Sequence, residues 1–298
     1  MASDYAALWM VGTLFALLLV GYPVALTLGG VALWFGLAFL DVDFLSLLPL
    51  RIWGVMTNGT LLAVPLFIFM GVQLEKSGLA EELLESMAAL WGRLRGGHAL
   101  AVIAAGALLA ASTGIVGASV VTMGLISLPV LLKHGYPKRF AAGVICAAGT
   151  LGQIIPPSIV LVLLGDIVGV SVGELFLAAV VPGLLLVCGY ASYALFVCRR
   201  NPPTNVELPS ENDIHPARVL WSLISTGSLM VTVLGSIFFG IASPTEAAAV
   251  GAFGAMVLSL INRTLSARTV GEVSWTTMQL TSMVFLILLG ATAFGLVF

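Results

Sequence analysis

The chain has 298 residues, of which 60% are hydrophobic and only 9% are charged, and its mean hydropathy is +1.12. This composition excludes the soluble globular classes and predicts an all-α membrane protein that crosses the bilayer several times. The formal net charge of −2, without any run of lysine and arginine, gives no indication of a nucleic-acid partner.

Apolar stretches of roughly the 20 residues that cross a bilayer as a helix recur along the chain. They fall at residues 5–21, 23–40, 59–75, 140–168, 171–198, 217–240, 244–262 and 279–298. The first lacks a basic leader and a small-residue cleavage site, so we interpret it as a retained helix rather than a signal peptide. Arg199, Arg200 and Arg218 flank a polar loop at 201–216 and predict that it lies in the cytoplasm.

Three segments are too polar to cross the membrane but long enough to form helices. The strongest, residues 79–95, repeats apolar side chains at helical spacing. These are Leu83, Met87, Leu90 and Leu94. The pattern predicts a helix that lies along the membrane interface, and residues 43–57 and 264–278 show it in weaker form.

An apolar segment at residues 98–132 has a polar, glycine-rich centre and basic residues outside both ends. Because lysine and arginine favour the cytoplasmic side, both ends are expected there, and the segment enters the membrane and returns as a hairpin. Its centre reads STGIVGAS, from Ser112 to Ser119. Irregular backbone at that depth survives only where protein buries it or a watery cavity meets it, which is typical of a transporter or a channel.

The centre of this hairpin offers oxygen ligands. Ser112, Thr113 and Ser119 carry hydroxyl groups, and Gly114 and Gly117 leave backbone groups open to a ligand. A hard cation such as Na⁺ takes several such oxygens. The alternative is that these small residues only allow two helices to pack closely.

A second polar interruption lies inside residues 140–168, at GTLGQIIPPS. Pro156 and Pro157 remove two amide donors and bar regular helix just before them. In a membrane the freed carbonyls need partners, which predicts a discontinuous helix that lines a cavity, with Thr150 and Ser158 beside the break. The alternative is a proline kink without a ligand.

Two further polar positions have a local explanation. Ser243-Pro244-Thr245-Glu246 has the spacing of a capping box with proline at the first helical position. We favour this interpretation over a proton-coupling glutamate. Asn58 opens the span that leads to Pro65 and either caps that helix or faces a site.

The two ends of the chain resemble each other. GYP at 21–23 matches ASP at 242–244, and LFIFMG at 66–71 matches FLILLG at 285–290, with offsets of 221 and 219 residues. The matched spans run in opposite directions across the membrane, as in the inverted repeats of secondary transporters. A repeat of this length places a second hairpin beyond Phe298, so we expect the chain to be part of a longer protein.

Other function classes have little support in the residues. No HExxH, GxSxG or paired intramembrane carboxylates occur, so we do not expect an enzyme. An ion channel is the alternative to a transporter, although no filter motif or charged ring is present.

The segments discussed above resemble the large membrane subunit of tripartite ATP-independent periplasmic (TRAP) transporters. The matching stretches cover most of residues 10–298 and include GYPVALTLGGVAL, NGTLLAVPLFIFMGVQLEKSGLAEELLE, RGGHALAVIAAGALLAASTGIVGASVVTMG, GTLGQIIPPSIVLVLLGD, SVGELFLAAVVPGLLL and GIASPTEAAAVGAF. Two departures are that the family's second hairpin has no counterpart here and that many members have a more serine-rich first tip.

The resemblance implies an elevator-type transporter of the bacterial inner membrane, built on an inverted repeat with interfacial arm helices. It implies sodium-driven import of a small organic acid, with no cofactor other than Na⁺ as coupling ion. It also implies two protein partners, a small four-helix membrane subunit and a soluble periplasmic substrate-binding protein. A secondary transporter of the same repeat type outside this family remains an alternative.

By match to the family, the hairpin tip and the broken helix form a sodium and substrate site. The expected sodium ligands are Ser112, Gly117, Ser119, Thr150, Gly152 and Pro156. The expected substrate-binding residues are Thr113, Gly114, Ser158 and Asn58. The expected parts of the chain are scaffold spans and an arm helix (1–96), a transport part (97–168) with hairpin 97–133 and broken helix 140–168, a span (169–200), the loop (201–216) and the start of a second repeat (217–298).

Overall fold

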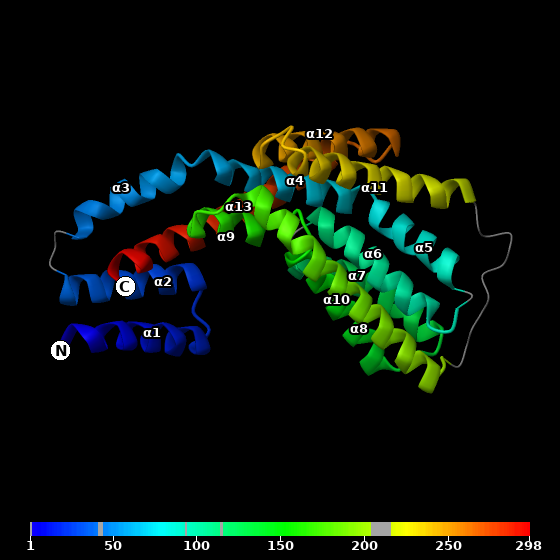
Figure 1. The fold of residues 1–298 in the computed structure, drawn as a ribbon, viewed down its shortest axis with the longest axis horizontal. Helices are drawn as coiled ribbons and strands as arrows, with labels where there is room; N and C mark the ends of the chain where they lie inside the picture. Colours follow the sequence, from blue (N-terminus) through cyan, green and yellow to red (C-terminus); the bar gives the residue numbers. More distant parts are fainter. Residues whose placement is uncertain (1, 41–43, 93, 114–115, 204–215) are drawn as a thin grey trace. The chain divides into compact units, whose positions relative to one another are not determined.

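The computed structural model describes residues 2–40, 44–92, 94–113, 116–203 and 216–298, and these ranges are almost entirely helical (Figure 1). Thirteen α-helices and two short 3-10 turns occur in them, and none of the described residues lies in a β-strand. Long apolar segments become helices because a helix satisfies every backbone hydrogen bond within the segment. The chain divides into two units, residues 1–59 with 278–298 and residues 60–277.

The first unit is built from helices at both ends of the chain. They are α1 (Ala2–Val20), α2 (Val24–Phe39), α3 (Phe44–Met56) and the last part of α13 (Ala267–Val297). Gly21 has a φ of 99°, a left-handed conformation that favours glycine, and it turns the chain from α1 into α2. A small core joins Met10, Val31 and Phe35 to Ala293 of α13.

The second unit contains the remaining helices, including the hairpin and the interrupted helix expected from the sequence. They are α4 (Ala63–Lys76), α5 (Leu79–Trp91), α6 (Gly97–Thr113), α7 (Val116–Lys133), α8 (Lys138–Thr150), the 3-10 turn η2 (Leu151–Gln153), α9 (Ile159–Val168), α10 (Val172–Arg200), α11 (Pro216–Phe238), α12 (Pro244–Ile261) and the first part of α13. Among these elements α4 packs extensively against α12, and α8 packs against both α6 and α7.

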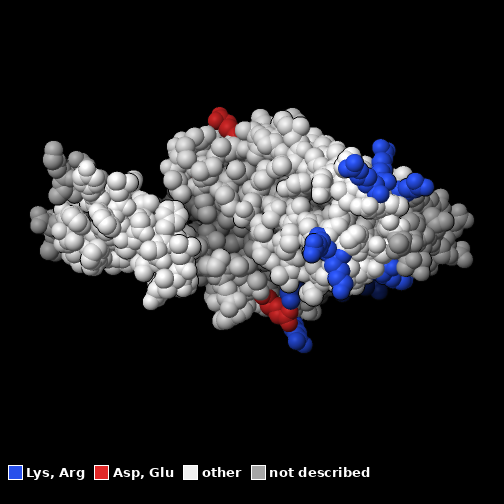
Figure 2. Space-filling model, turned by 90° about the horizontal axis from the view of Figure 1, so that it is seen from below, with Lys and Arg blue, Asp and Glu red and all other residues white. Residues whose placement is uncertain are grey.

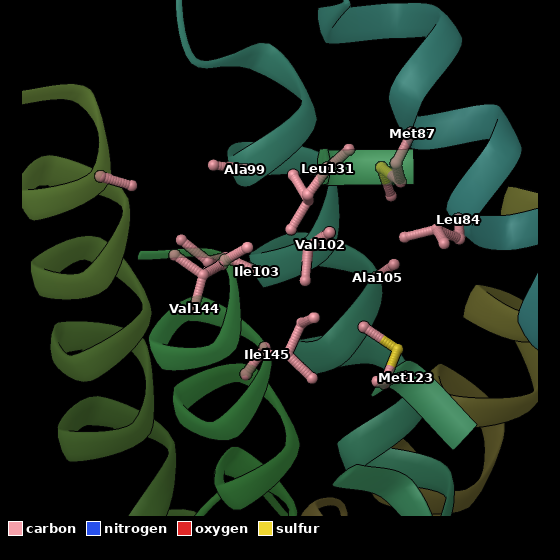
Figure 3. Close-up of a cluster of buried hydrophobic side chains, with 14 of the residues drawn as sticks. Leu84, Met87, Ala99, Val102, Ile103, Ala105, Met123, Leu131, Val144 and Ile145 are labelled. Carbon is pink, nitrogen blue, oxygen red and sulfur yellow. The ribbon is translucent and has the colours of Figure 1, made fainter. Parts of the chain in front are cut away.

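The main core of the second unit lies between the hairpin and its neighbours (Figure 3). Val102 and Ala105 of α6 face Met123 of α7 and Ile145 of α8, and Leu84 of α5 reaches the same cluster. All of these side chains are buried. The hairpin therefore belongs to a packed helical core and is not a loop on the surface.

Five helices in the described part of the chain are long and apolar enough to cross a membrane. They are Gly59–Lys76, Val172–Arg200, Leu220–Phe238, Pro244–Ile261 and Ala267–Val297. Much of their surface is apolar and exposed, for example Leu184 and Leu185 of α10. Exposed apolar surface of this extent is expected of helices that contact lipid.

One of the three segments expected to be interfacial helices differs from its prediction. Residues 264–278 were predicted to form a separate helix, which is wrong, because α13 runs without a break from Ala267 to Val297. No proline interrupts this stretch. Residues 79–91 form a helix, α5, and Leu83 and Met87 of its apolar stripe pack into the core with α6.

Candidate functional site

The two arms of the hairpin, α6 and α7, contact the last turn of α8, and glycine makes the contact close. Gly106 of α6 lies against Ala148 of α8, where an added Cβ would come 2.6 Å from the Ala148 Cβ. Gly149 of α8 lies against Val120 of α7, where an added Cβ would come 2.4 Å from Cγ2. A larger residue at either glycine would force the hairpin away from α8.

The helix that begins as α8 is interrupted after Thr150 and resumes at Ile159. Between them lie the 3-10 turn η2 and a cis peptide bond joining Pro156 to Pro157. The two prolines end the regular helix, as predicted from their missing amide donors. The turn η2 packs against α6, α7 and α10, and Gly152 is buried there.

Two hydroxyl groups flank the break, and both donate their hydrogen to a backbone carbonyl. Ser158, which is 0% exposed, donates from Oγ to the carbonyl oxygen of Gln153 over 2.8 Å. Thr150 donates from Oγ1 to the carbonyl oxygen of Ala147 over 2.9 Å. Since each hydroxyl has already used its only hydrogen, its oxygen can only accept further interactions.

The hairpin tip is described in part. The side chains of Ser112 and Thr113, at the end of α6, and all of Gly114 lie outside the described residues. Gly117 is exposed in the first turn of α7, and Ser119, two residues later, is 6% exposed. The contact of Val120 with Gly149 brings the start of α7 to the end of α8, beside the break.

Asn58, predicted to bind substrate or to cap a helix, belongs to the first unit. Its backbone N–H donates to the carbonyl oxygen of Val55 over 3.3 Å, at the end of α3. The helical segment that follows Asn58 begins with the 3-10 turn Gly59–Leu62, and Leu62 is the N-cap of α4 itself.

The capping box predicted at Ser243 is confirmed. The backbone N–H of Ser243 donates to Glu246 Oε2 over 2.8 Å, and the N–H of Glu246 donates back to Ser243 Oγ over 3.3 Å. The carboxylate of Glu246 therefore stabilises the start of α12.

Two polar contacts within the second unit were missed by sequence reasoning. Thr122 of α7 donates to Glu75 of α4 over 2.6 Å. The side-chain amide of Gln73, also in α4, donates to Ser259 of α12 over 2.8 Å in a fully buried position. The available signal was a glutamine and a glutamate in an otherwise apolar helix, since such residues inside a membrane protein need partners.

Aromatic side chains lie together at the open end of the hairpin. The rings of His98, in the first turn of α6, and His134, after α7, lie with their centroids 3.8 Å apart. Tyr136 is buried beside them, and this burial raises the pKa of its phenol to about 12.

A bundle of long apolar helices with a helical hairpin seated on an interrupted helix defines a polytopic membrane protein. Residues 11–298 match the family model described as the tripartite ATP-independent periplasmic transporter, DctM component, and the chain belongs to this family. The chain is accordingly a multi-pass protein of the bacterial inner membrane.

The chain is also similar to curated large permease proteins. It is 36% identical to the C4-dicarboxylate TRAP transporter large permease protein DctM of Pseudomonas aeruginosa, over 85% of this chain and 59% of that protein. It is 38% identical to the protein of the same name from Vibrio cholerae, over 79% of this chain and 52% of that protein. It is 31% identical to the ectoine/5-hydroxyectoine TRAP transporter large permease protein UehC of Ruegeria pomeroyi, over 95% of this chain and 66% of that protein.

The chain thus spans between about half and two thirds of the length of these relatives. All three relatives are named as transport permeases, which agrees with the expectation that the chain is not an enzyme.

Proposed function

We propose that this chain is the large membrane subunit of a secondary transporter that imports a small organic acid with a sodium gradient. Family membership supports transport, and the names of relatives support the substrate class. These names include C4-dicarboxylate, isethionate and sialic acid, all of which are anions at neutral pH. A carboxylate or 2-oxo acid is the substrate class that we propose here.

The main support for this proposal is that the end of α8 and the beginnings of α7 and α9 lie close together at the break. The C-terminal end of α8 contacts the first turns of α7 through Gly149, and η2 packs against α6, α8 and α9. A helix C-terminus favours a cation and a helix N-terminus favours an anion. The end of α8 and the starts of α7 and α9 therefore offer a cation and a carboxylate complementary surroundings within one small region.

The hydroxyl groups at the break have the polarity that a cation needs. Thr150 and Ser158 point their hydrogens at backbone carbonyls, so their oxygens offer lone pairs only. This arrangement favours Ser158 as a sodium ligand over its predicted role with the substrate. We keep the remaining sodium ligands as Ser112, Gly117, Ser119, Gly152 and Pro156, and the remaining substrate contacts as Thr113, Gly114 and Asn58.

Transport in this proposal follows an elevator mechanism. The re-entrant hairpin and the broken helix, within residues 97–168, move together against a scaffold that includes spans 5–75, with both hairpin ends in the cytoplasm. An inverted repeat, completed by a second hairpin, would supply the rest of the site. A small membrane subunit and a periplasmic substrate-binding protein would complete the transporter and deliver the acid.

The test is uptake by proteoliposomes that contain the permease, expressed from its complete reading frame, with its membrane partner. Labelled C4-dicarboxylates and 2-oxo acids are offered with the binding protein, under an inward sodium gradient, an equal potassium gradient or no gradient. Concentrative uptake with sodium alone supports the proposal. Uptake that is equal under all three conditions, or single-channel currents without concentration, would replace it with a channel or a differently coupled carrier.

A further inference from the structure

A groove of about 260 Å³ opens on the second unit between α6, α8 and α10. Ile103 of α6, Phe140 and Val144 of α8, and Tyr190 and Tyr193 of α10 form its walls. Arg139, in the first turn of α8, also lines it. The groove runs along α8 from Arg139 to Ala147, which lies in the last turn of this helix. Arg139 lies 11 residues before Thr150, about 16 Å along the helix, so the basic end of the groove is distant from the candidate site.

Small residues on α8 keep the groove open. Gly143 and Ala147 line it, and a Cβ added at Gly143 would meet no heavy atom within 4 Å. Gly189 of α10 has equally open surroundings but does not line the groove. An apolar groove on a membrane-embedded surface takes up hydrocarbon in preference to water, because water gains no hydrogen bonds there.

The charge at one end of the groove restricts what occupies it. Arg139 is exposed and Lys138 precedes it, while Arg199 and Arg200 end α10, the helix on the other side of the groove. Lysine and arginine side chains gather over this end of the second unit, where α8 begins and α10 ends (Figure 2). The guanidinium of arginine matches phosphate through two parallel hydrogen bonds.

We propose that this groove binds one acyl chain of an anionic phospholipid, whose headgroup phosphate lies against Arg139. The two tyrosines, apolar in the ring and polar at the hydroxyl, suit the boundary between the acyl and headgroup regions. Basic pockets between membrane helices on the cytoplasmic side bind anionic headgroups in this way. The lipid would link the hairpin arm α6 and the interrupted helix to α10.

Native mass spectrometry of the permease, expressed from its complete reading frame, tests this site. Phosphatidylglycerol and phosphatidylcholine with identical acyl chains are titrated into the detergent-solubilised protein. We expect tighter retention of phosphatidylglycerol, and a fall of about fivefold in that affinity in Arg139→Gln, since one basic residue near the headgroups contributes about that much. Equal retention of the two lipids by the wild-type protein would overturn the proposal.

Matched variants distinguish lipid binding in this groove from non-specific attraction of anionic lipid to the basic surface. Arg263→Asn removes one positive charge from an exposed position with a φ of 58°, which asparagine accepts, and should retain the lipid. Gly143→Leu should fill the groove and lower retention of both lipids, whereas Gly189→Leu should leave it unchanged. Equal losses in Arg139→Gln and Arg263→Asn would show diffuse attraction only. If Gly143→Leu does not fold, the two arginine variants still decide the outcome.

Discussion

The contact of α7 with α8 and the contact of α4 with α12 both depend on a glycine, but different atoms face these glycines. A Cβ at Gly149 would come 2.4 Å from Val120 Cγ2 and 3.0 Å from Val120 Cα. A Cβ at Gly251 of α12 would come 2.5 Å from the Met70 sulfur and 3.0 Å from Val233 Cγ2. Valine is restricted at χ1 and its Cα cannot move alone, whereas methionine has three rotatable bonds.

This difference indicates which contacts within the second unit are rigid and which can adjust. The hairpin is seated on α8 by a contact that has no adjustable side chain, directly before the break. The α4–α12 pair is held by a contact whose closest atom belongs to a flexible side chain. The hairpin and α8 should therefore behave as one rigid body, and the α4–α12 pair should tolerate change.

The largest expected effect is that of Gly149→Ala. Overpacking against Val120 should lower the free energy of unfolding by about 3 kcal/mol, because backbone and a β-branched side chain must both shift. Gly251→Ala, the matched control, should cost about 1 kcal/mol, because Met70 can change rotamer and only Val233 Cγ2, 3.0 Å away, must shift slightly. Thermal unfolding of the purified proteins in one detergent measures both. Equal losses of stability would contradict the distinction drawn between the two contacts.

The next effect concerns the buried polar pair of the α4–α12 contact. Ser259 donates to the carbonyl of Ala255 over 2.9 Å and accepts from Gln73 Nε2, while Gln73 Oε1 is buried without a hydrogen-bond partner. Ser259→Ala should cost about 1–3 kcal/mol, because the amide of Gln73 then loses its acceptor. Gln73→Leu should change the stability by less than about 1 kcal/mol, because Ser259 keeps its own bond to Ala255.

A double-mutant cycle tests this account of the pair. If Ser259→Ala destabilises the protein because the side-chain amide of Gln73 loses its acceptor, this loss of stability should largely disappear when Gln73→Leu is already present. An unchanged cost of Ser259→Ala in the Gln73→Leu background would show that the hydrogen bond across the helices contributes little.

Features that depend on neighbouring residues were predictable from the sequence. The helix break follows from the missing amides of Pro156 and Pro157, and the capping box follows from the three-residue spacing of Ser243 and Glu246. Each depends on a few adjacent positions, so the local pattern is enough.

Features that depend on distant residues were not predictable in this way. Gln73 and Ser259 are 186 positions apart, and nothing in either helix alone indicates the other as its partner. The seating of Gly149 on Val120 likewise requires the tertiary arrangement of the hairpin. The length of α13 was missed because the interfacial pattern of residues 264–278 has no local stop signal to separate it from the apolar span that follows.

The smallest expected effect distinguishes a ligand serine from a packing serine. Ser119, at the hairpin tip, and Ser259, between α4 and α12, are both buried, and only Ser119 is a proposed sodium ligand. Ser119→Ala and Ser112→Ala should each lower the apparent affinity for sodium by about fivefold, equivalent to about 1 kcal/mol, through the loss of one oxygen ligand. Sodium-dependent uptake and the sodium dependence of the melting temperature give this affinity.

Ser259→Ala is the control, because it should change the stability of the protein but not its apparent affinity for sodium. It should lower stability as described and leave the apparent sodium affinity unchanged, because no proposed ligand touches Ser259. Sodium binding stabilises the folded state by an amount that grows with the logarithm of the ratio of the ion concentration to its dissociation constant. The hairpin variants should therefore lose part of this stabilisation, and the control should keep it. If both hairpin variants kept the wild-type sodium affinity, the oxygens at the tip would not be ligands, and Ser112 and Ser119 would be small residues that allow close packing, as elsewhere in the chain.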